Sequence, residues 1–310
     1  MNELLKQYMN LIDFKDFFLI FEKYLSTPSL VRLKNIGYFC GMDYASKEIY
    51  NFSGYVSRYD HSLTVALITW MCTEDKRATL AALFHDISTP CFSHVIDYMN
   101  NDYIEQESTE QYTKDILDKD EYLLECLKED GILLDEIIDF KKYTIVDNKR
   151  PKLCADRLDG VILTGLYWTK NLTLEEVKNI IADIEIFINE DNEKEIGFKS
   201  KDIAKLVVKT NKSIDIYCHS KEDIFMMELL ANITKNAIHK NIISYEDLYK
   251  LDEEELINIL EKCTDNEILL ELFRFKNIKL KEIPDFDMPV IKIRSLNPLV
   301  DGIRLNDFMI

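Results

Sequence analysis

Residues 80–89 read LAALFHDIST, an apolar run that ends in the adjacent pair His85 and Asp86. The apolar residues recur at helical spacing and predict a helix over about 75–87. A carboxylate that follows such a run needs a compensating partner, because burying an unpaired carboxylate is costly. Two partners fit this pair: an arginine in a salt bridge, which is the commoner case, or a divalent metal ion.

Histidine is scarce in the chain, and its few copies are clustered. Of the 5 histidines, three lie close together in sequence: His61, His85 and His94. His61 begins a helix predicted over 61–73, for which Asp60 is the expected N-cap. The clustering directs attention to metal or acid–base chemistry in this part of the chain.

A further carboxylate, Asp156, lies in a helix predicted to run from near Pro151 through Leu166. It completes a set of two imidazoles and two carboxylates with His61, His85 and Asp86. Such a set suits one divalent ion of Mn, Fe, Ni, Co, Mg or Zn, and leaves positions open for water and a phosphate oxygen.

Three short segments carry these four residues. Residues 57–63 read SRYDHSL, residues 83–94 read LFHDISTPCFSH, and residues 155–159 read ADRLD. They are similar to the patterns S-R-[FY]-[DE]-H-S-L, L-x-H-D-[IL]-G-H-x-P-F-S-H and A-D-R-[LM]-D. Together they resemble the HD superfamily of metal-dependent phosphohydrolases, in the branch that holds the deoxynucleoside triphosphate triphosphohydrolases (dGTPase-like enzymes). The part that bears the motifs spans about residues 28–165.

This resemblance implies roles for the matching residues. A single metal ion would be held by His61, His85, Asp86 and Asp156, and Asp86 is therefore expected to be essential for turnover. Guanidinium groups suit phosphate oxygens, so contacts to substrate phosphates are expected from Arg58 and Arg157. Water orientation or proton transfer beside the metal is expected from His94 and Asp97. Outside the resemblance, the two arginines would be read as ion-pair partners and His94 as a packed histidine.

The chain also departs from the family pattern, at four positions. Thr89 stands where the branch has a second histidine, and Gln106, followed by Glu107, stands where it often has His-Glu. Gly160 and Thr164 replace the tyrosine and aspartate that help to hold the sugar. Two accounts fit: a hydrolase for a different phosphoester that uses Glu107 and His94 as acids and bases, or an HD scaffold that binds a nucleotide for regulation or interaction. Glu107 equally suits a helix-capping role.

Composition limits the partners. The 38 basic and 56 acidic residues give a net charge of −18, which argues against a nucleic-acid partner. The apolar runs are too short to cross a membrane, and no signal-peptide pattern opens the chain. The 7 scattered cysteines suggest reduced thiols in the cytoplasm. We expect a small phosphorylated substrate, such as a nucleotide, and, from the resemblance, a homo-oligomer.

The expected fold is mostly α: an HD-domain helical bundle with additional helices and a short β appendage at the C-terminus. Only 8 glycines and 6 prolines punctuate the chain, too few for an all-β protein. Helices are predicted over 1–25, 132–146 and 173–189 among others, and short strands over 277–283 and 290–293. Four parts are expected: N-terminal helices and an aromatic loop (1–55), the metal-binding HD core (56–170), a helical extension (171–275) and a β tail (276–310).

Overall fold

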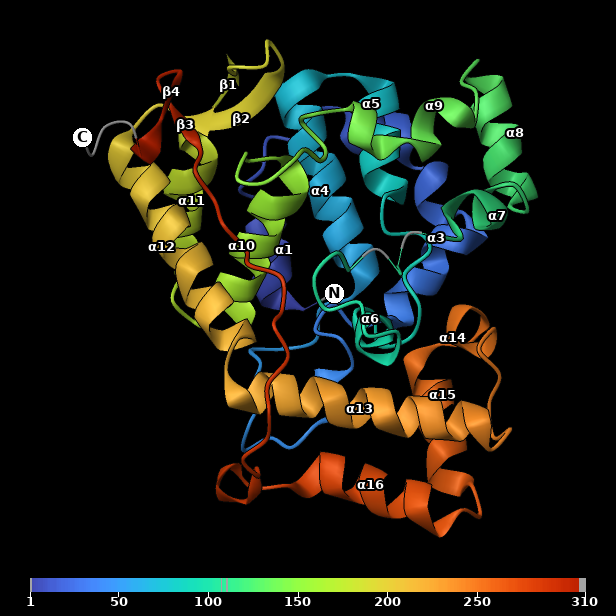
Figure 1. Cartoon of the computed structure of the whole chain (residues 1–310). Coiled ribbons are helices and arrows are strands. Elements are labelled where there is room, and N and C mark those ends of the chain that lie inside the picture. The colour runs from blue at the N-terminus through green and yellow to red at the C-terminus, as the bar shows by residue number, and fades with distance from the viewer. Residues whose placement is uncertain (1, 107, 110, 307–310) are drawn as a thin grey trace.

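Two helices that pack against each other as a hairpin lie at the centre of the fold, α4 (Arg58–Thr73) and α5 (Lys76–Phe84) (Figure 1). The structure, a computed structural model, describes residues 2–106, 108–109 and 111–306. Every residue of α4 from Arg58 to Thr69 is buried, as expected of a helix surrounded by other elements. A third helix, α10 (Ala155–Tyr167), also packs against α4. The residues of the predicted metal site lie on α4 and α10 or directly after α5.

The other helices surround this centre. Those before α10 are α1 (Glu3–Met9), α2 (Phe17–Phe21), α3 (Pro28–Arg32), α6 (Val95–Met99), α7 (Thr113–Leu117), α8 (Glu121–Glu129) and α9 (Asp135–Ile138). Those after it are α11 (Leu174–Asp183), α12 (Lys201–Cys218), α13 (Lys221–His239), α14 (Asp247–Lys250), α15 (Glu253–Lys262) and α16 (Asn266–Asn277). Single 3-10 turns are η1 (Tyr24–Ser26), η2 (Leu33–Asn35), η3 (Met42–Tyr44), η4 (Phe140–Lys142) and η5 (Leu280–Glu282). The predicted mostly helical bundle is confirmed, and among the described residues no helix combines the length and the apolar character that a membrane span requires.

The start of α4 differs from the prediction in a way that matters for the site. Its N-cap is Ser57 and not Asp60, because the two residues form a capping box. The hydroxyl of Ser57 accepts the N–H of Asp60 at 3.1 Å, and the carboxylate of Asp60 accepts the N–H of Ser57 at 2.9 Å. Arg58 and His61 therefore both lie on the first turn of one helix.

Three other predicted helices are divided or shorter. The helix expected over 1–25 is two helices, α1 and α2, and Asp16, just before α2, has a left-handed φ of 53°. The segment 132–146 holds only α9 and the turn η4. The helix expected from near Pro151 begins at Ala155 instead. Apolar spacing located these elements, but loop conformations set their ends.

The prediction of a helix over 173–189 is wrong after Asp183. Helix α11 ends at Asp183, and the chain continues as strand β1 (Ile184–Ile188), which pairs antiparallel with β2 (Lys194–Phe198). The β1 residues, IEIFI, are rich in β-branched and aromatic side chains, which favour a strand. A Cβ on Gly197 would lie 2.7 Å from the carbonyl oxygen of Leu299, so glycine lets the C-terminal tail lie beside β2.

The tail forms strands later than predicted. Residues 277–283 contain the turn η5, and 290–293 belong to no helix or strand. The strands are β3 (Leu299–Val300), parallel to β2, and β4 (Ile303–Arg304), antiparallel to β3, in the sheet order β1-β2-β3-β4. We call residues 285–298 the C-terminal strap. It runs from beyond α16 past α10 and α12 to the sheet (Figure 1).

A buried ion pair fixes the end of the tail to β2. The guanidinium of Arg304 donates to both carboxylate oxygens of Glu195, at 2.5 and 2.7 Å. Glu195 is fully buried and also accepts the N–H of Leu153 at 3.1 Å. The Glu195 carboxylate needs the Arg304 guanidinium as its partner, because an unpaired buried carboxylate is strongly destabilising.

We predict that Arg304→Ala lowers the free energy of unfolding by about 3–5 kcal/mol, because Glu195 is then buried without its cation. Urea unfolding followed by circular dichroism measures this. Arg77→Ala is the matched control, since Arg77 pairs with Glu136 at 2.7 Å on the surface and should change stability little. Equal small effects of the two substitutions would show that the tail is not held by this ion pair.

A second buried acid joins α15 to the centre. Glu253 is fully buried, and its carboxylate accepts the N–H of Phe92 at 2.9 Å. Burial raises the pKa of Glu253 to about 8 and that of Asp43 to about 6. A Cβ on Gly37 would lie 3.0 Å from an oxygen of each acid, so the two carboxyl groups converge there.

The raised pKa of Glu253 predicts a pH dependence of stability. The folded chain favours the protonated form of Glu253. The contribution of this group to the free energy of unfolding is therefore complete below the pKa of the unfolded chain, about 4.5, and is lost as the pH rises through about 8. Relative to Glu253→Gln, the native protein should therefore lose stability between pH 5 and pH 8, measured by urea unfolding. The exposed neighbour variant Glu254→Gln should follow the native protein. A pH-independent difference between native protein and Glu253→Gln would contradict the prediction.

Candidate metal centre

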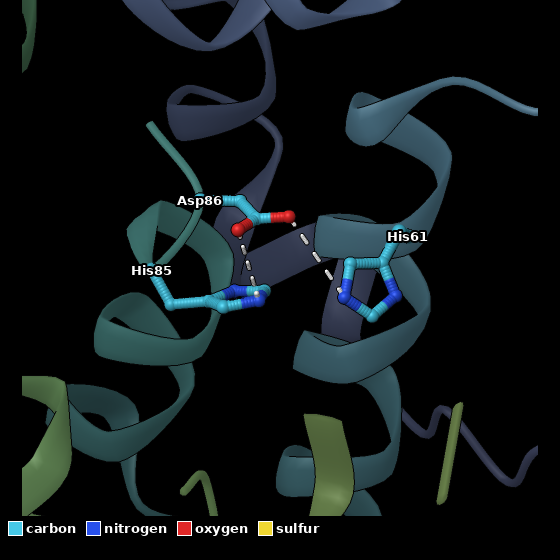
Figure 2. Close-up of side chains that lie close together, drawn as sticks. All are labelled: His61, His85 and Asp86. Carbon is cyan, nitrogen blue, oxygen red and sulfur yellow. Dashed lines mark ion pairs between the residues drawn. The ribbon is translucent and has the colours of Figure 1, made fainter. Parts of the chain in front are cut away.

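The four predicted ligands meet where three helices begin or end. His61 lies on the first turn of α4, His85 is the C-cap of α5 and Asp86 follows it. Asp156 lies on the first turn of α10. One ligand atom from each of His61, His85 and Asp86 lies within 4.8 Å of the others. Figure 2 shows the Asp86 carboxylate between the two imidazoles.

Four nitrogen–oxygen distances describe how the two imidazoles lie relative to the two carboxylates. The Nε2 atom of His61 lies 3.0 Å from Asp156 Oδ1 and 3.9 Å from Asp86 Oδ2. The Nε2 atom of His85 lies 3.7 Å from Asp156 Oδ1 and 3.8 Å from Asp86 Oδ1. Ligands bound at 2.0–2.2 Å to one ion lie at most about 4.4 Å apart, so each of these four nitrogen–oxygen separations is compatible with a shared divalent metal. The group in which all ligand atoms lie within 4.8 Å of one another contains His61, His85 and Asp86, whereas Asp156 approaches it only through the two imidazoles.

His85 gives the clearest indication that the site binds a group from outside the protein. Its Nδ1 contacts the carbonyl oxygen of Ala82 at 2.7 Å, which fixes the ring. Its Nε2 is buried and has no hydrogen-bond partner among the described residues. A buried polar atom without a partner is costly, and this one faces the carboxylates of Asp86 and Asp156.

Asp159 orients His61 and received no role from the sequence. Its Oδ2 lies 2.6 Å from Nδ1 of His61, and its Oδ1 accepts the hydroxyl of Tyr8 at 2.6 Å. This is the carboxylate–imidazole support that metal-binding histidines commonly have. The available signal was its position in ADRLD, one helical turn after Asp156 and hence on the same side of α10.

Charges around the cluster shift the pKa values of its members. Burial opposes the charged form of His61, but hydrogen bonds to Asp156 and Asp159 outweigh it and raise the pKa to about 10. Burial likewise opposes ionisation of Asp86 and Asp156, and the adjacent cations hold the pKa of both carboxyl groups well below the usual value. Without an ion His61 is thus protonated, so metal binding must release a proton.

Asp86 has the arginine partner that the sequence analysis offered as the alternative to a metal. Arg58 Nη1 donates to Asp86 Oδ2 at 2.9 Å, its Nε donates to Ser93 at 3.1 Å, and its guanidinium lies over the ring of Tyr38. Asp86 Oδ1 remains turned towards His85. The salt bridge and the ligand cluster therefore coexist, and Arg58 lies at the edge of the site.

The second predicted phosphate contact, Arg157, is engaged differently. Its two Nη atoms donate to Asp147, to the side chain and backbone of Asn148 and to the carbonyl of Lys152. Four of its five N–H donors are therefore used by the loop that precedes α10. Asp147 and Cys154 also lie near Asp156 and form a second potential ligand group, but Asp147 is paired with Arg157 at 2.9 Å.

The predicted proton-transfer residues form a pair. His94 Nδ1 lies 2.9 Å from the buried carboxylate of Asp97. Asp97 Oδ1 also accepts the N–H of Ser108 at 3.1 Å. His94 lines the same cavity as His61, whereas the structure does not bring it into the ligand cluster. Glu107, the remaining candidate, lies outside the described residues.

A cavity of about 250 Å³ opens beside the metal cluster. The aromatic segment 37–58 supplies part of its wall, including stacked rings of Phe39 and Phe52 with centroids 4.3 Å apart. Three of the four positions that depart from the family pattern also line it: Gln106, Gly160 and Thr164. The fourth, Thr89, is buried and is not part of the lining. Two arginines that sequence reasoning did not single out, Arg150 and Arg294, line the same cavity.

Comparison with known proteins identifies the domain. Residues 58–143 match the HD domain family. The uncharacterized protein YdhJ of Bacillus subtilis (strain 168) is 26% identical over 251 residues, which cover 81% of this chain and 73% of YdhJ. The metal-dependent phosphohydrolase cns2 of the fungus Cordyceps militaris is 22% identical over 247 residues, which cover 78% of this chain and 70% of that protein.

Two solved structures share the fold. A hypothetical protein from Aquifex aeolicus superposes with a TM-score of 0.60 at 17% identity, covering 83% of this chain and 70% of its own. A phosphohydrolase from Bacteroides thetaiotaomicron superposes with a TM-score of 0.52 at 14% identity, covering 82% and 72%. Residues 58–143 thus carry an HD domain, and the clustered residues His61, His85 and Asp86 lie inside this matched region.

Proposed function

We propose that this protein is a phosphohydrolase that cleaves a nucleotide or another small phosphoester with the help of one divalent metal ion. The observation that carries the proposal is the buried Nε2 of His85, which makes no hydrogen bond among the described residues and lies 3.8 and 3.7 Å from the carboxylates of Asp86 and Asp156. The ion would be held by His61, His85, Asp86 and Asp156, and Mn, Fe, Ni, Co, Mg and Zn all suit such ligands. When bound, it supplies Lewis acidity and water of lowered pKa.

Arg58 and Arg157 contribute positive charge to the substrate site in different ways. Arg58 is buried beside Asp86, where its charge favours the ionised ligand and a phosphate alike. Arg157 fixes the loop before α10 through its hydrogen bonds and adds charge to the cavity wall. We propose that Arg58 is the more direct of the two phosphate contacts.

The pair of His94 and Asp97 suits proton transfer. The contact between Nδ1 and Asp97 holds the imidazole in one orientation, and the second ring nitrogen remains for exchange with water or substrate. Since His94 lines the cavity without joining the metal cluster, we assign it to the handling of protons. The role of Glu107 stays a proposal from the sequence alone.

The altered positions bear on the alternative function, an HD scaffold that binds a nucleotide without turnover. Gln106, Gly160 and Thr164 line the cavity and leave all four ligands intact, which supports a changed substrate over a lost metal. A Cβ on Gly160 would lie 3.1 Å from the hydroxyl of Tyr38. The Tyr38 hydroxyl therefore lies close to position 160, where the dGTPase-like branch has a tyrosine side chain. Cleavage of deoxynucleoside triphosphates is accordingly one of several activities to screen.

We predict about one divalent metal per chain in protein purified without chelator or His-tag, and its loss in Asp86→Ala and Asp156→Ala. Elemental analysis measures the metal, and a nucleotide and phosphoester screen with that metal measures turnover. Each substitution should lower kcat by more than about 100-fold, because the charge stabilisation at the phosphate is lost.

Asp13→Ala is the control for these variants, since Asp13 is an exposed aspartate far from the cluster in sequence. It should keep both metal and turnover. Circular dichroism separates loss of function from unfolding. Full activity of folded Asp86→Ala would refute the mechanism. Metal binding with no turnover of any compound would favour the regulatory scaffold.

We further predict that Asp159→Asn weakens metal binding by about 10–100-fold, because His61 loses the carboxylate that orients its ring. Titration of the metal-free protein with Mn²⁺ gives the Kd. Tyr8→Phe is the matched control: it removes the other hydrogen bond to Asp159 and leaves the imidazole contact in place. A Kd of Asp159→Asn equal to that of the native protein would show that Asp159 has only a packing role.

A further inference from the structure

The chain between the proposed ligand Asp86 and the proposed proton-transfer residue His94 contains a strained turn. Phe92 and Ser93 both have left-handed backbone conformations, with φ of 64° and 50°. Residues with a β-carbon rarely adopt this conformation, and for a bulky side chain such as that of Phe92 it costs free energy. A turn of this kind persists only where the surrounding structure holds it.

This turn directs two side chains that belong to the site. The hydroxyl of Ser93 accepts Nε of Arg58 at 3.1 Å and donates to the carbonyl of Gly37 at 3.1 Å. The next residue, His94, lines the cavity beside the metal cluster, and its Nδ1 lies 2.9 Å from Asp97. The directions of Ser93 and His94 therefore both depend on the backbone of the turn.

A buried acid on α15, far along the chain, holds the turn. Glu253 is fully buried, and its Oε1 accepts the N–H of Phe92 at 2.9 Å. The preceding amide, that of Cys91, donates to the carbonyl of Leu248 on α14 at 2.7 Å. Two successive amides of the turn are thus bound by α14 and α15, which lie outside the residues that match the HD domain family, 58–143.

A carboxyl group buried at position 253 requires an explanation, because burial without a cation is destabilising. No lysine or arginine of the described chain donates to Glu253, and a second carboxyl group, that of Asp43, converges with it at Gly37. Stability alone would favour an apolar residue here. The N–H of Phe92 explains the acid, since a buried N–H without an acceptor is also costly.

Packing also restrains the turn, but it restrains a different part. The Phe92 ring is fully buried, and it lies so close to Gly41 that a Cβ there would be 2.6 Å from Cδ1 of the ring. These contacts fix the position of the ring. The hydrogen bond to Glu253 fixes the direction of the Phe92 N–H, and this direction sets the φ angle that makes the backbone left-handed.

We propose that Glu253 is a positioning residue for the metal site: by accepting the N–H of Phe92 it keeps the turn left-handed, and so directs His94 into the cavity and Ser93 towards Arg58. The inference rests on the proposed function, because His94 and Arg58 have their roles there. Glu253 acts through the turn and is not a catalytic residue. The HD domain site is then completed by a helix from the C-terminal part of the chain.

The test compares Glu253→Met with Glu253→Gln in the full-length protein. Methionine has a similar length and no strong acceptor, whereas glutamine keeps an oxygen that can accept the N–H of Phe92. The readout is the ¹⁵N spectrum of the His94 imidazole in the presence of Mg²⁺, which is diamagnetic. The native protein should hold the proton on Nδ1, which contacts Asp97. Glu253→Met should give a mixture of tautomers, and Glu253→Gln should keep the native spectrum.

Turnover is the second readout, with any phosphoester that the native protein cleaves. Glu253→Met should lower kcat by at least about 10-fold, because a small misplacement of reacting groups is costly in rate. Glu253→Gln should restore most of it. The spectrum needs no turnover, so this inference and the proposed function can fail separately.

Leu256→Ala is the matched control, because Leu256 is a fully buried residue of the same helix and its truncation loosens α15 without removing the acceptor. If it alters the His94 spectrum as much as Glu253→Met does, Glu253 serves stability alone and the inference is refuted. A native His94 spectrum in folded Glu253→Met also refutes it, since packing of Phe92 then suffices.

If Glu253→Met does not fold, hydrogen exchange in the native protein decides. The amide of Phe92 should exchange as slowly as that of Val95, which donates to the carbonyl of Phe92 at 3.0 Å. Much faster exchange at Phe92 would show that Glu253 does not hold this amide, and would overturn the inference.

Discussion

The partly buried carboxylate of Asp86 is the charge around which the centre of this protein is arranged. It follows an apolar helix and is only 17% exposed, so nearby cations compensate for the hydration that it loses. Arg58 provides one at 2.9 Å, and the imidazoles of His61 and His85 lie at 3.9 and 3.8 Å. This arrangement requires α4 to begin with the capping box at Ser57 and α5 to end at Phe84. Local capping energetics and the electrostatics of the site therefore depend on the same few residues.

The cavity beside the cluster depends on contacts between segments far apart in the chain. The aromatic segment 37–58, helix α10 and the C-terminal strap each supply part of its lining. The strap is fixed by hydrogen bonds to α12 and to Pro151, and its far end by the buried pair of Arg304 and Glu195. The stability of the tail and the shape of the cavity are thus linked, although β3 and β4 contain none of the proposed metal ligands and pair only with β2 and with each other.

Charge is distributed unevenly in this acidic protein. Many of its acids balance surface lysines or cap helices, whereas the cavity gathers four arginines. Two of the four have carboxylate partners, and Asp156 and Asp223 also line the cavity. The overall charge argues against a general polyanion-binding surface, but it does not describe the cavity, because local potential is set by the groups that the fold brings together.

The sequence by itself determined the helical class and pointed to the four candidate ligands, because apolar periodicity and the segments SRYDHSL, LFHDIST and ADRLD are local signals. It also indicated an aromatic loop within residues 1–55. It did not predict strand β1, whose β-branched run follows a helix without a break. The support of His61 by Asp159 and the placing of Arg294 beside Arg150 were decided only by the tertiary structure. Those contacts join residues about 100 or more positions apart in the sequence. They arise from how the helices and the strap pack, and no local sequence pattern predicts which distant residues will meet.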